Sequence, residues 1–281
     1  IAAWSSFAGG TLASIYLLFL APSLSKVSLS FRSPDYFALM ILGLTAIAAF
    51  SSKGQFLKAM MMVVLGLMLA SVGQDSLSDI SRFTFNNMNL SDGISFVLVV
   101  MATFAMSEAL TIILKRNDPS AVAKQVSLTE LGSIKINKEE RTKMLKAIPR
   151  NSVIGFLIGV LPGAGATIAS FLAYGMERNF VSDEEKEKFG KGSVHGLTAP
   201  ETANNAACSG AFVPLLTLGI PGSGTTAVML GALLGFGIQP GPRLYITNPE
   251  IFWSVIMSMY IGMVVLLILN LPLIPYIARI L

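Results

Sequence analysis

The chain alternates long apolar stretches with short polar links, and this pattern predicts helices rather than strands. Four apolar stretches come first, near residues 1–22, 35–51, 56–73 and 94–114. Residues 94–114 contain one charged side chain, and the last apolar stretch, 251–278, contains none. Stretches of about 20 residues with few or no charges are typical of membrane-spanning helices. The pattern therefore predicts four spans within residues 1–114 and a terminal span within residues 251–281.

Two later segments, 151–175 and 203–238, are apolar but rich in Gly, Pro, Ser and Thr, and they contain a repeated motif. LPGAGAT (161–167) and IPGSGTT (220–226) place Pro, Gly, Gly and Thr at the same spacing. Proline removes a backbone donor and disrupts the preceding turn, and glycine readily takes irregular angles. At membrane depth such breaks persist only where they are buried in protein or line a watery cavity. Each copy, within a motif region at 151–250, predicts a discontinuous helix or a re-entrant hairpin.

The residues that follow each break favour a binding role. The first amides of a new helix lack partners and carry the positive end of its macrodipole, and glycines leave them accessible to a carboxylate. Nearby hydroxyls add donors, and the carbonyls that end the preceding half-helix suit Na⁺. Close helix packing is the alternative for a lone motif, but two copies favour binding. The expected substrate-binding residues are Pro162, Gly163, Gly165, Thr167, Pro221, Gly222, Ser223, Gly224, Thr225 and Thr226.

A polar cluster lies between the two motifs, in GLTAPETANNAACSG. Glu201, Asn204 and Asn205 stand at i, i+3 and i+4, so they share one face of a helix. A carboxylate and two amides supply oxygen ligands that a hard cation prefers, which favours an ion-binding or coupling role. A helix cap at the water boundary is the alternative for Glu201. Glu108, inside the fourth span, is a second candidate for coupling, with a buried acid paired to a hydroxyl as its alternative.

Composition supports a membrane protein, and the distribution of charge predicts which segments lie on each side of the membrane. The chain is 53% hydrophobic and 13% charged, whereas a soluble domain has about 25% charged residues. Residues 115–150 contain nine Lys and Arg against four acids, a net charge of +5 in a chain whose total is +4. An excess of Lys and Arg marks cytoplasmic loops. This basic loop therefore places residue 1 inside and residues 74–93 outside, with Lys26 and Arg32 against the rule.

Several classes of protein are excluded by residues that the chain lacks. The single cysteine, Cys208, and the single histidine, His195, exclude an internal disulfide and a cluster of transition-metal ligands. No HExxH, Ser-His-Asp or Gly-Lys-Ser/Thr arrangement occurs, so we expect neither an enzyme nor a nucleotide site. The basic loop lacks interleaved aromatics, which argues against nucleic acid. No cofactor is expected beyond Na⁺ as a coupling ion, and His195 is expected as an interfacial side chain.

Several of these segments resemble the large membrane subunit of the tripartite tricarboxylate transporters. They are GVLPGAGATIASFLAYGMER, PETANN, LGIPGSGTT and GIQPGP, with SPDYFALMILGL and DGISFVLVVMATFAMSE upstream. The resemblance runs across nearly all of the 281 residues and is most specific over 155–242. The family's motif positions fall on Pro162, Gly163, Gly165, Glu201, Asn204, Asn205, Pro221, Gly222 and Ser223.

The resemblance implies an all-α polytopic protein of the bacterial inner membrane, built as an inverted-repeat secondary transporter with an elevator-like movement. It implies import of a carboxylate, commonly citrate or a related acid, driven by a Na⁺ or H⁺ gradient. Its implied partners are a small four-helix membrane subunit, a periplasmic solute-binding protein and the lipid bilayer. It further implies an internal fragment that lacks the N-terminal motif region and the C-terminal end. A channel and a structural membrane subunit without its own substrate site are the alternatives.

Overall fold

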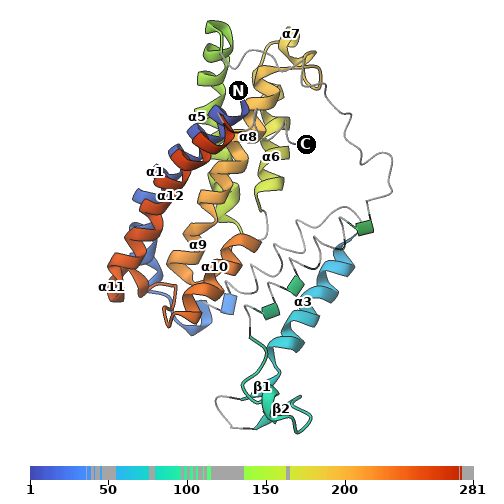
Figure 1. Ribbon diagram of the computed structural model, residues 1–281, viewed down its shortest axis with the longest axis vertical. Coiled ribbons are helices and arrows are strands. Elements are labelled where there is room, and N and C mark those ends of the chain that lie inside the picture. The colour runs from blue at the N-terminus through green and yellow to red at the C-terminus, as the bar shows by residue number, and fades with distance from the viewer. Residues whose placement is uncertain are drawn as a thin grey trace.

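The computed structural model describes residues 1–35, 55–75, 80–95, 136–162 and 165–271, with isolated positions between 37 and 114 and at 273. Within these residues the chain is almost entirely helical, which agrees with the predicted all-α class (Figure 1), while the polytopic, inverted-repeat arrangement stays a prediction. The longer helices are α1 (Ala2–Ser28), α3 (Phe56–Ala70), α5 (Lys138–Val160), α6 (Gly165–Phe180), α8 (Val194–Gly210), α10 (Gly224–Gly235) and α12 (Pro249–Asn270). The shorter elements are α7 (Asp183–Lys186), α9 (Phe212–Leu218), α11 (Leu244–Thr247), the antiparallel pair β1 (Gly73–Gln74) and β2 (Ser81–Arg82), and the 3₁₀ turn η1 (Met88–Leu90).

Helix α8 lies at the centre of the bundle, and α1, α5 and α6 all pack against it (Figure 1). Ser6 of α1 donates a 2.9 Å hydrogen bond to Glu201 of α8, and Ser14 lies 3.4 Å from Ser209 farther along, so these helices run in the same direction. Helix α6 runs the opposite way, because Glu177 near its end meets His195 near the start of α8. Helix α3 and the β1–β2 pair lie apart from the bundle (Figure 1).

Helices α5 and α8 approach closely because small residues face each other along their contact. A Cβ added to Gly155 would lie 2.5 Å from the Cα of Ala203, and one on Gly159 would lie 2.6 Å from the Cα of Ala207. Both pairs repeat every four residues, the spacing that lets two backbones touch. The order of these pairs makes α5 parallel to α8 and hence to α1. Residues 1 and 138 therefore lie at the same end, as the predicted sidedness requires, although the sidedness itself stays a prediction.

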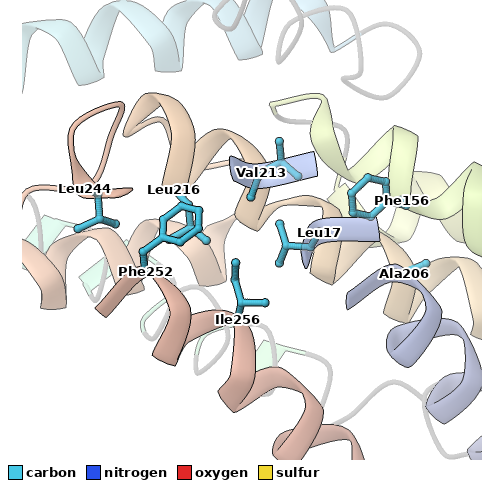
Figure 2. Packing of buried hydrophobic residues seen from close by; sticks show 10 residues of the cluster. Leu17, Phe156, Ala206, Val213, Leu216, Leu244, Phe252 and Ile256 are labelled. Atoms are coloured by element: carbon cyan, nitrogen blue, oxygen red, sulfur yellow. The ribbon is translucent and has the colours of Figure 1, made fainter. Parts of the chain in front are cut away.

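The main apolar core lies between α1, α9 and α12 (Figure 2). Leu17, Leu216, Phe252 and Ile256 are fully buried there, and burial of each such side chain contributes roughly 1.5–3 kcal/mol. The opposite face of α12 stays open, since Ile261 is 67% exposed. A helix that is apolar on both its packed and its open face suits a lipid boundary.

The predicted spans and the observed helices agree in part. Among the described residues, α1 and α12 are long and apolar enough to cross a membrane, and α3, with 15 residues, is apolar but shorter. Most of the predicted spans at 35–51 and 94–114 lies outside the described residues. One boundary differs: α5 begins at Lys138, inside the range predicted as a loop. Asn137 and Glu140 form a reciprocal capping box that starts the helix there.

Both predicted helix breaks are present. Helix α5 ends at Val160, Leu161 is extended, and α6 begins again at Gly165 with φ +69. In the second copy, α9 ends at a left-handed Gly219, and α10 begins after an extended Ser223. Proline without a donor and glycine without a Cβ explain both interruptions. Their location within a bilayer stays a prediction.

Candidate functional site

The start of α10 is organised by Ser223 and Thr226. The Ser223 N–H donates to Thr226 Oγ1 over 2.8 Å, and the Thr226 N–H donates to Ser223 Oγ over 3.3 Å, which is a capping box. The box satisfies the third amide of the helix. Within the described residues, the first two amides, those of Gly224 and Thr225, have no hydrogen-bond partner. The helix therefore offers two free donors at the positive end of its dipole.

These donors line a pocket of about 550 Å³, which we call the tip pocket. Its walls come from three places: the start of α6, the end of α8 and the turn before α10. The predicted residues on its walls are Gly165, Pro221, Gly222, Ser223, Gly224 and Thr225. Ala207, Cys208 and Ala211 complete the side formed by α8. The structure thus brings the beginnings of two helices, 59 positions apart in the repeat, to one cavity.

Three of the predicted tip residues that the structure describes do not line this pocket. Pro162 lines a separate apolar groove between α1, α5 and α9. Thr167 is exposed one position beyond the pocket lining. Thr226 is 1% exposed, and its hydroxyl donates to the Ser223 carbonyl, so it stabilises the helix start instead of facing the cavity. Gly163 lies outside the described residues.

Two of the predicted ion-binding residues, Glu201 and Asn204, lie earlier in α8 than the part that lines the tip pocket. Glu201 and Asn204 line a pocket of about 560 Å³ with Ser170 and Tyr174 of α6. Glu201 accepts a hydrogen bond from Ser6, while Asn204 donates to Ser170 over 3.1 Å. Glu201 and Asn204 thus tie α8 to α1 and to α6, respectively. Their sharing of one helix face, as predicted, places both side chains on this cavity.

The other two candidates for ion coupling lie elsewhere. Asn205 donates its amide to the main-chain carbonyl of Glu201 over 3.1 Å and does not line the pocket. Glu108 lies outside the described residues. Among the described residues, no group of three His, Cys, Asp or Glu side chains could hold a metal ion. A cation at Glu201 would therefore be held by a mixture of carboxylate, amide and hydroxyl oxygens.

A buried ionic cluster joins three helices at the end of the bundle near α7. The Glu177 carboxylate is completely buried. It accepts hydrogen bonds from Arg150 Nε and Nη2, at 2.9 and 2.6 Å, and from the Asn151 amide at 2.7 Å. His195 Nδ1 lies 2.8 Å from the same carboxylate. His195 is thus 7% exposed and paired inside the protein, not the interfacial side chain that the sequence predicted.

This cluster decides the protonation of Glu177. Burial by itself raises the pKa of a carboxyl group, because it disfavours the charged form. The hydrogen bonds from Arg150, Asn151 and His195 outweigh that burial, and together they lower the pKa of Glu177 below its usual range. Glu177 lies in the charged segment 177–192, outside the predicted membrane segments. It is therefore an ionised structural group that holds α5, α6 and α8 together.

Two groups that matter here were not singled out from the sequence. Cys208 lies seven residues after Glu201, two helical turns along the same face, and that spacing is a signal for its place beside the second motif. Glu177 had a weaker signal, as a lone acid that ends an apolar segment. Nothing in the spacing of Arg150 and Glu177 indicates that they meet. Their contact depends on how α6 packs back along α5 after the break between these helices.

Comparison with known proteins identifies the family. The model described as "Tripartite tricarboxylate transporter TctA family" matches residues 1–281. The chain belongs to this family. The TctA family is a family of membrane transporters and not of enzymes. The resemblance predicted from the motifs is thereby confirmed.

Two curated relatives of this TctA family member carry names that describe them as uncharacterised. An Agrobacterium vitis protein of 52.8 kDa, from the TAR-I ttuC' 3' region, is 40% identical over 273 residues, which cover 97% of this chain and 53% of the relative. A second A. vitis protein, from the TAR-II ttuC' 3' region, is 48% identical over 120 residues, 43% of this chain and 49% of that relative. The chain spans about half the length of the curated relatives it matches. No solved structure matches it.

Proposed function

We propose that this chain forms half of the substrate pathway of a secondary transporter that imports tricarboxylates or related carboxylates. The carrying observation is the tip pocket, in which the beginnings of α6 and α10 meet around free amides of Gly224 and Thr225. Helix N-termini favour anions through unpaired N–H groups and through the macrodipole. Discontinuous helices whose starts face an anionic substrate are a recurring design of secondary transporters.

The lining of the tip pocket also suits an anion. Its walls contain glycine and alanine at Gly165, Gly222, Ala207 and Ala211, so a ligand can approach the backbone closely. None of the described residues that line it is an acid. A volume of about 550 Å³ lies within the usual range for small-molecule sites, roughly 300–1,000 Å³.

Coupling to a cation gradient is assigned to Glu201 and Asn204. Their pocket contains a carboxylate, an amide oxygen and a hydroxyl, which suit Na⁺, and the carboxylate alone suits H⁺. In the full system the partners are the small four-helix membrane subunit and a periplasmic solute-binding protein, in the bacterial inner membrane. A channel would conduct without these partners, and a structural subunit would tolerate changes at the tips.

The proposal predicts that Gly222→Val abolishes carboxylate uptake by the complete transporter. A Cβ on Gly222 would lie 3.1 Å from Ala211, so the larger side chain forces the tip away from α8. The matched control is Gly235→Val at the other end of α10, where an added Cβ meets nothing within 4 Å. Uptake of labelled citrate and succinate by the three-part system, in Na⁺ and in choline, is the measurement. Unchanged uptake by Gly222→Val would contradict the proposal.

Substrate binding can be measured separately through protection of Cys208, which is exposed and lines the tip pocket. In a transporter that keeps Cys208 as its one cysteine, a charged methanethiosulfonate reagent should modify this thiol, and saturating carboxylate should slow the modification. Chloride at equal ionic strength is the control. A modification rate that no carboxylate in the panel changes would argue for a structural subunit instead.

A further inference from the structure

Helix α11 lies at the end of the bundle opposite α7 (Figure 1). A further polar pocket lies beside α11. It has a volume of about 480 Å³ and lies between the end of α1 and the turn that precedes α11. Its polar side chains include Gln239, Arg243 and Asn248, and Ser28 and Gly241 form part of its walls. We call it the Arg243 pocket. It shares no lining residue with the tip pocket.

The donors of this pocket are free within the described part of the chain. The Arg243 guanidinium makes no hydrogen bond or ion pair with a described residue, although the Arg243 carbonyl accepts from Thr247. The side-chain amides of Gln239 and Asn248 likewise have no partner among these residues. A guanidinium pairs with a carboxylate through two parallel hydrogen bonds, and amides add neutral donors to the remaining oxygens. This donor set suits a small molecule with more than one carboxylate.

Charge around the pocket is positive where topology alone would not place it. The segments 22–35 and 236–252 contain three basic residues, Lys26, Arg32 and Arg243, against two acidic ones, Asp35 and Glu250, a net charge of +1. Of these five charged residues, Arg243 alone lines the pocket. This end is the one predicted to face outward, where Lys and Arg are usually depleted. Among the described residues that line the pocket, Arg243 therefore supplies a positive charge with no acid beside it, and such a lining attracts anions.

The Arg243 pocket and the tip pocket adjoin the same short segment of backbone. The turn at residues 240–242 folds back onto Gly219, where an added Cβ would lie 2.7 Å from the Pro240 carbonyl oxygen. Gly219 is left-handed, at φ +73, and ends α9. Only Ile220 and Pro221 separate it from Gly222 on the wall of the tip pocket. The two cavities therefore adjoin the same short stretch of backbone.

We propose that the Arg243 pocket is an outer binding site for a small carboxylate, which occupies it before it reaches the tip pocket. The proposal rests on the function proposed above for the class of ligand. Arg243 supplies the paired donors, Gln239 and Asn248 orient the remaining oxygens, and the tip pocket receives the same molecule afterwards. Such a site raises the local concentration of substrate and leaves the translocation step to the tips.

The test measures equilibrium binding of labelled citrate to the purified membrane subunits without the solute-binding protein. The variants are Gly222→Val, Arg243→Gln, the double variant and Arg178→Gln, which removes an exposed positive charge at the other end. Gly222→Val should keep one binding component, because Gly222 does not line the Arg243 pocket. Adding Arg243→Gln should weaken that component about tenfold or more, as expected for a lost charge-assisted contact. Arg178→Gln should bind like the unaltered protein.

Uptake kinetics of the single variants give a second measurement, which can be made even if the double variant does not fold. Arg243→Gln alone should raise the KM for carboxylate about tenfold and change the maximal rate less than about twofold, and Arg243→Lys should restore part of the affinity. An Arg243→Gln variant with the KM of Arg178→Gln would overturn the outer site and leave the proposed function intact. Absence of binding and uptake by the unaltered transporter would overturn the proposed function itself.

A phospholipid headgroup offers the same anionic chemistry, so a separate experiment must distinguish a bound lipid from a soluble carboxylate. The uptake measurement is repeated in vesicles of phosphatidylcholine alone and in vesicles that also contain phosphatidylglycerol. An effect of Arg243→Gln of equal size in both supports a soluble carboxylate. An effect confined to the phosphatidylglycerol vesicles would assign the pocket to lipid and overturn the proposal.

Discussion

At the scale of single residues, Glu177 is the clearest case of a side chain whose role depends on its neighbours. A completely buried carboxylate is costly unless it is paired and hydrogen-bonded. Arg150, Asn151 and His195 provide those partners from two other helices. Arg150 also stacks over the ring of Phe180, with 4.4 Å between the guanidinium carbon and the ring centroid. The cluster therefore fixes how the first broken segment returns to α8.

We predict that Glu177→Gln lowers the free energy of unfolding by about 3 kcal/mol, the lower end of what breaking a buried pair costs. The lower end applies because the Arg150 side chain is 32% exposed and so is partly solvated in the variant. The measurement is thermal or denaturant unfolding of the purified protein in detergent. Glu184→Gln, which removes an exposed acid next to this region, is the control and should change stability by less than about 0.5 kcal/mol.

The same cluster predicts how stability depends on pH. The pKa of Glu177 is lower in the folded protein than in the unfolded chain, where it is about 4.3. Its stabilising contribution is therefore complete above that unfolded value and is lost as pH falls through the lower folded pKa. The difference in stability between the unaltered protein and Glu177→Gln should shrink below about pH 4. A difference that stays constant with acidification would show that Glu177 is not ionised in the fold.

At the scale of helices, the small residues divide into two groups with different roles. Gly155 and Gly159 bring the backbone of α5 against Ala203 and Ala207 of α8. Gly165, in contrast, has open space around it and is needed for its positive φ at the start of α6. The sequence left close packing open as an alternative role for the motif glycines. Close packing describes the contact between α5 and α8, but it does not explain Gly165 at the tip.

We predict opposite effects for two identical substitutions in neighbouring helices. Gly159→Ala places a methyl group 2.6 Å from the Cα of Ala207, and such overpacking costs about 1–3 kcal/mol. Gly175→Ala lies on an open face of α6 with nothing within 4 Å, and it should stabilise the helix by about 0.5–1 kcal/mol. Unfolding midpoints of the two variants check both signs. Equal midpoints would mean that the α5–α8 contact is looser than described.

At the scale of the whole molecule, the two ends of the bundle differ in chemistry. One end has the buried Glu177 cluster and the surface ion pairs of Lys143 and Lys188 with Glu185. The other end has Arg243, whose guanidinium has no partner among the described residues, beside its pocket. The basic loop at 115–150 leads into α5 at the first end. If that loop is cytoplasmic, Arg243 faces outward.

This arrangement predicts a pattern of labelling in intact cells. In a chain with Cys208→Ala, a cysteine at Glu250 should react with a membrane-impermeant maleimide added outside. A cysteine at Glu184 should react only after permeabilisation. Both positions are exposed. Glu184 lies in α7 and Glu250 in the first turn of α12, just after α11, and α7 and α11 lie at opposite ends of the bundle (Figure 1). The reverse pattern would invert the topology and place the Arg243 pocket in the cytoplasm.

Much of the architecture follows from local chemistry that the sequence displays. Pro162 and Pro221 remove backbone donors, and the helices stop near both. The reciprocal Asn137 and Glu140 cap starts α5 within a range that apolarity alone assigned to a loop. The motifs also indicated the family and the face shared by Glu201 and Asn204. These features depend on residues within a few positions of one another, so the sequence by itself determines them.

Only the tertiary structure decided which distant groups meet. It placed Gly165, Gly222 and Cys208 on one cavity, turned Thr226 inward as a cap, and buried Glu177 against Arg150 and His195. It also folded the turn at 240–242 under Gly219 and so formed the Arg243 pocket. Each of these contacts depends on helix directions and on how closely small residues let helices approach. Local spacing does not encode those distances, because packing across the whole bundle sets them.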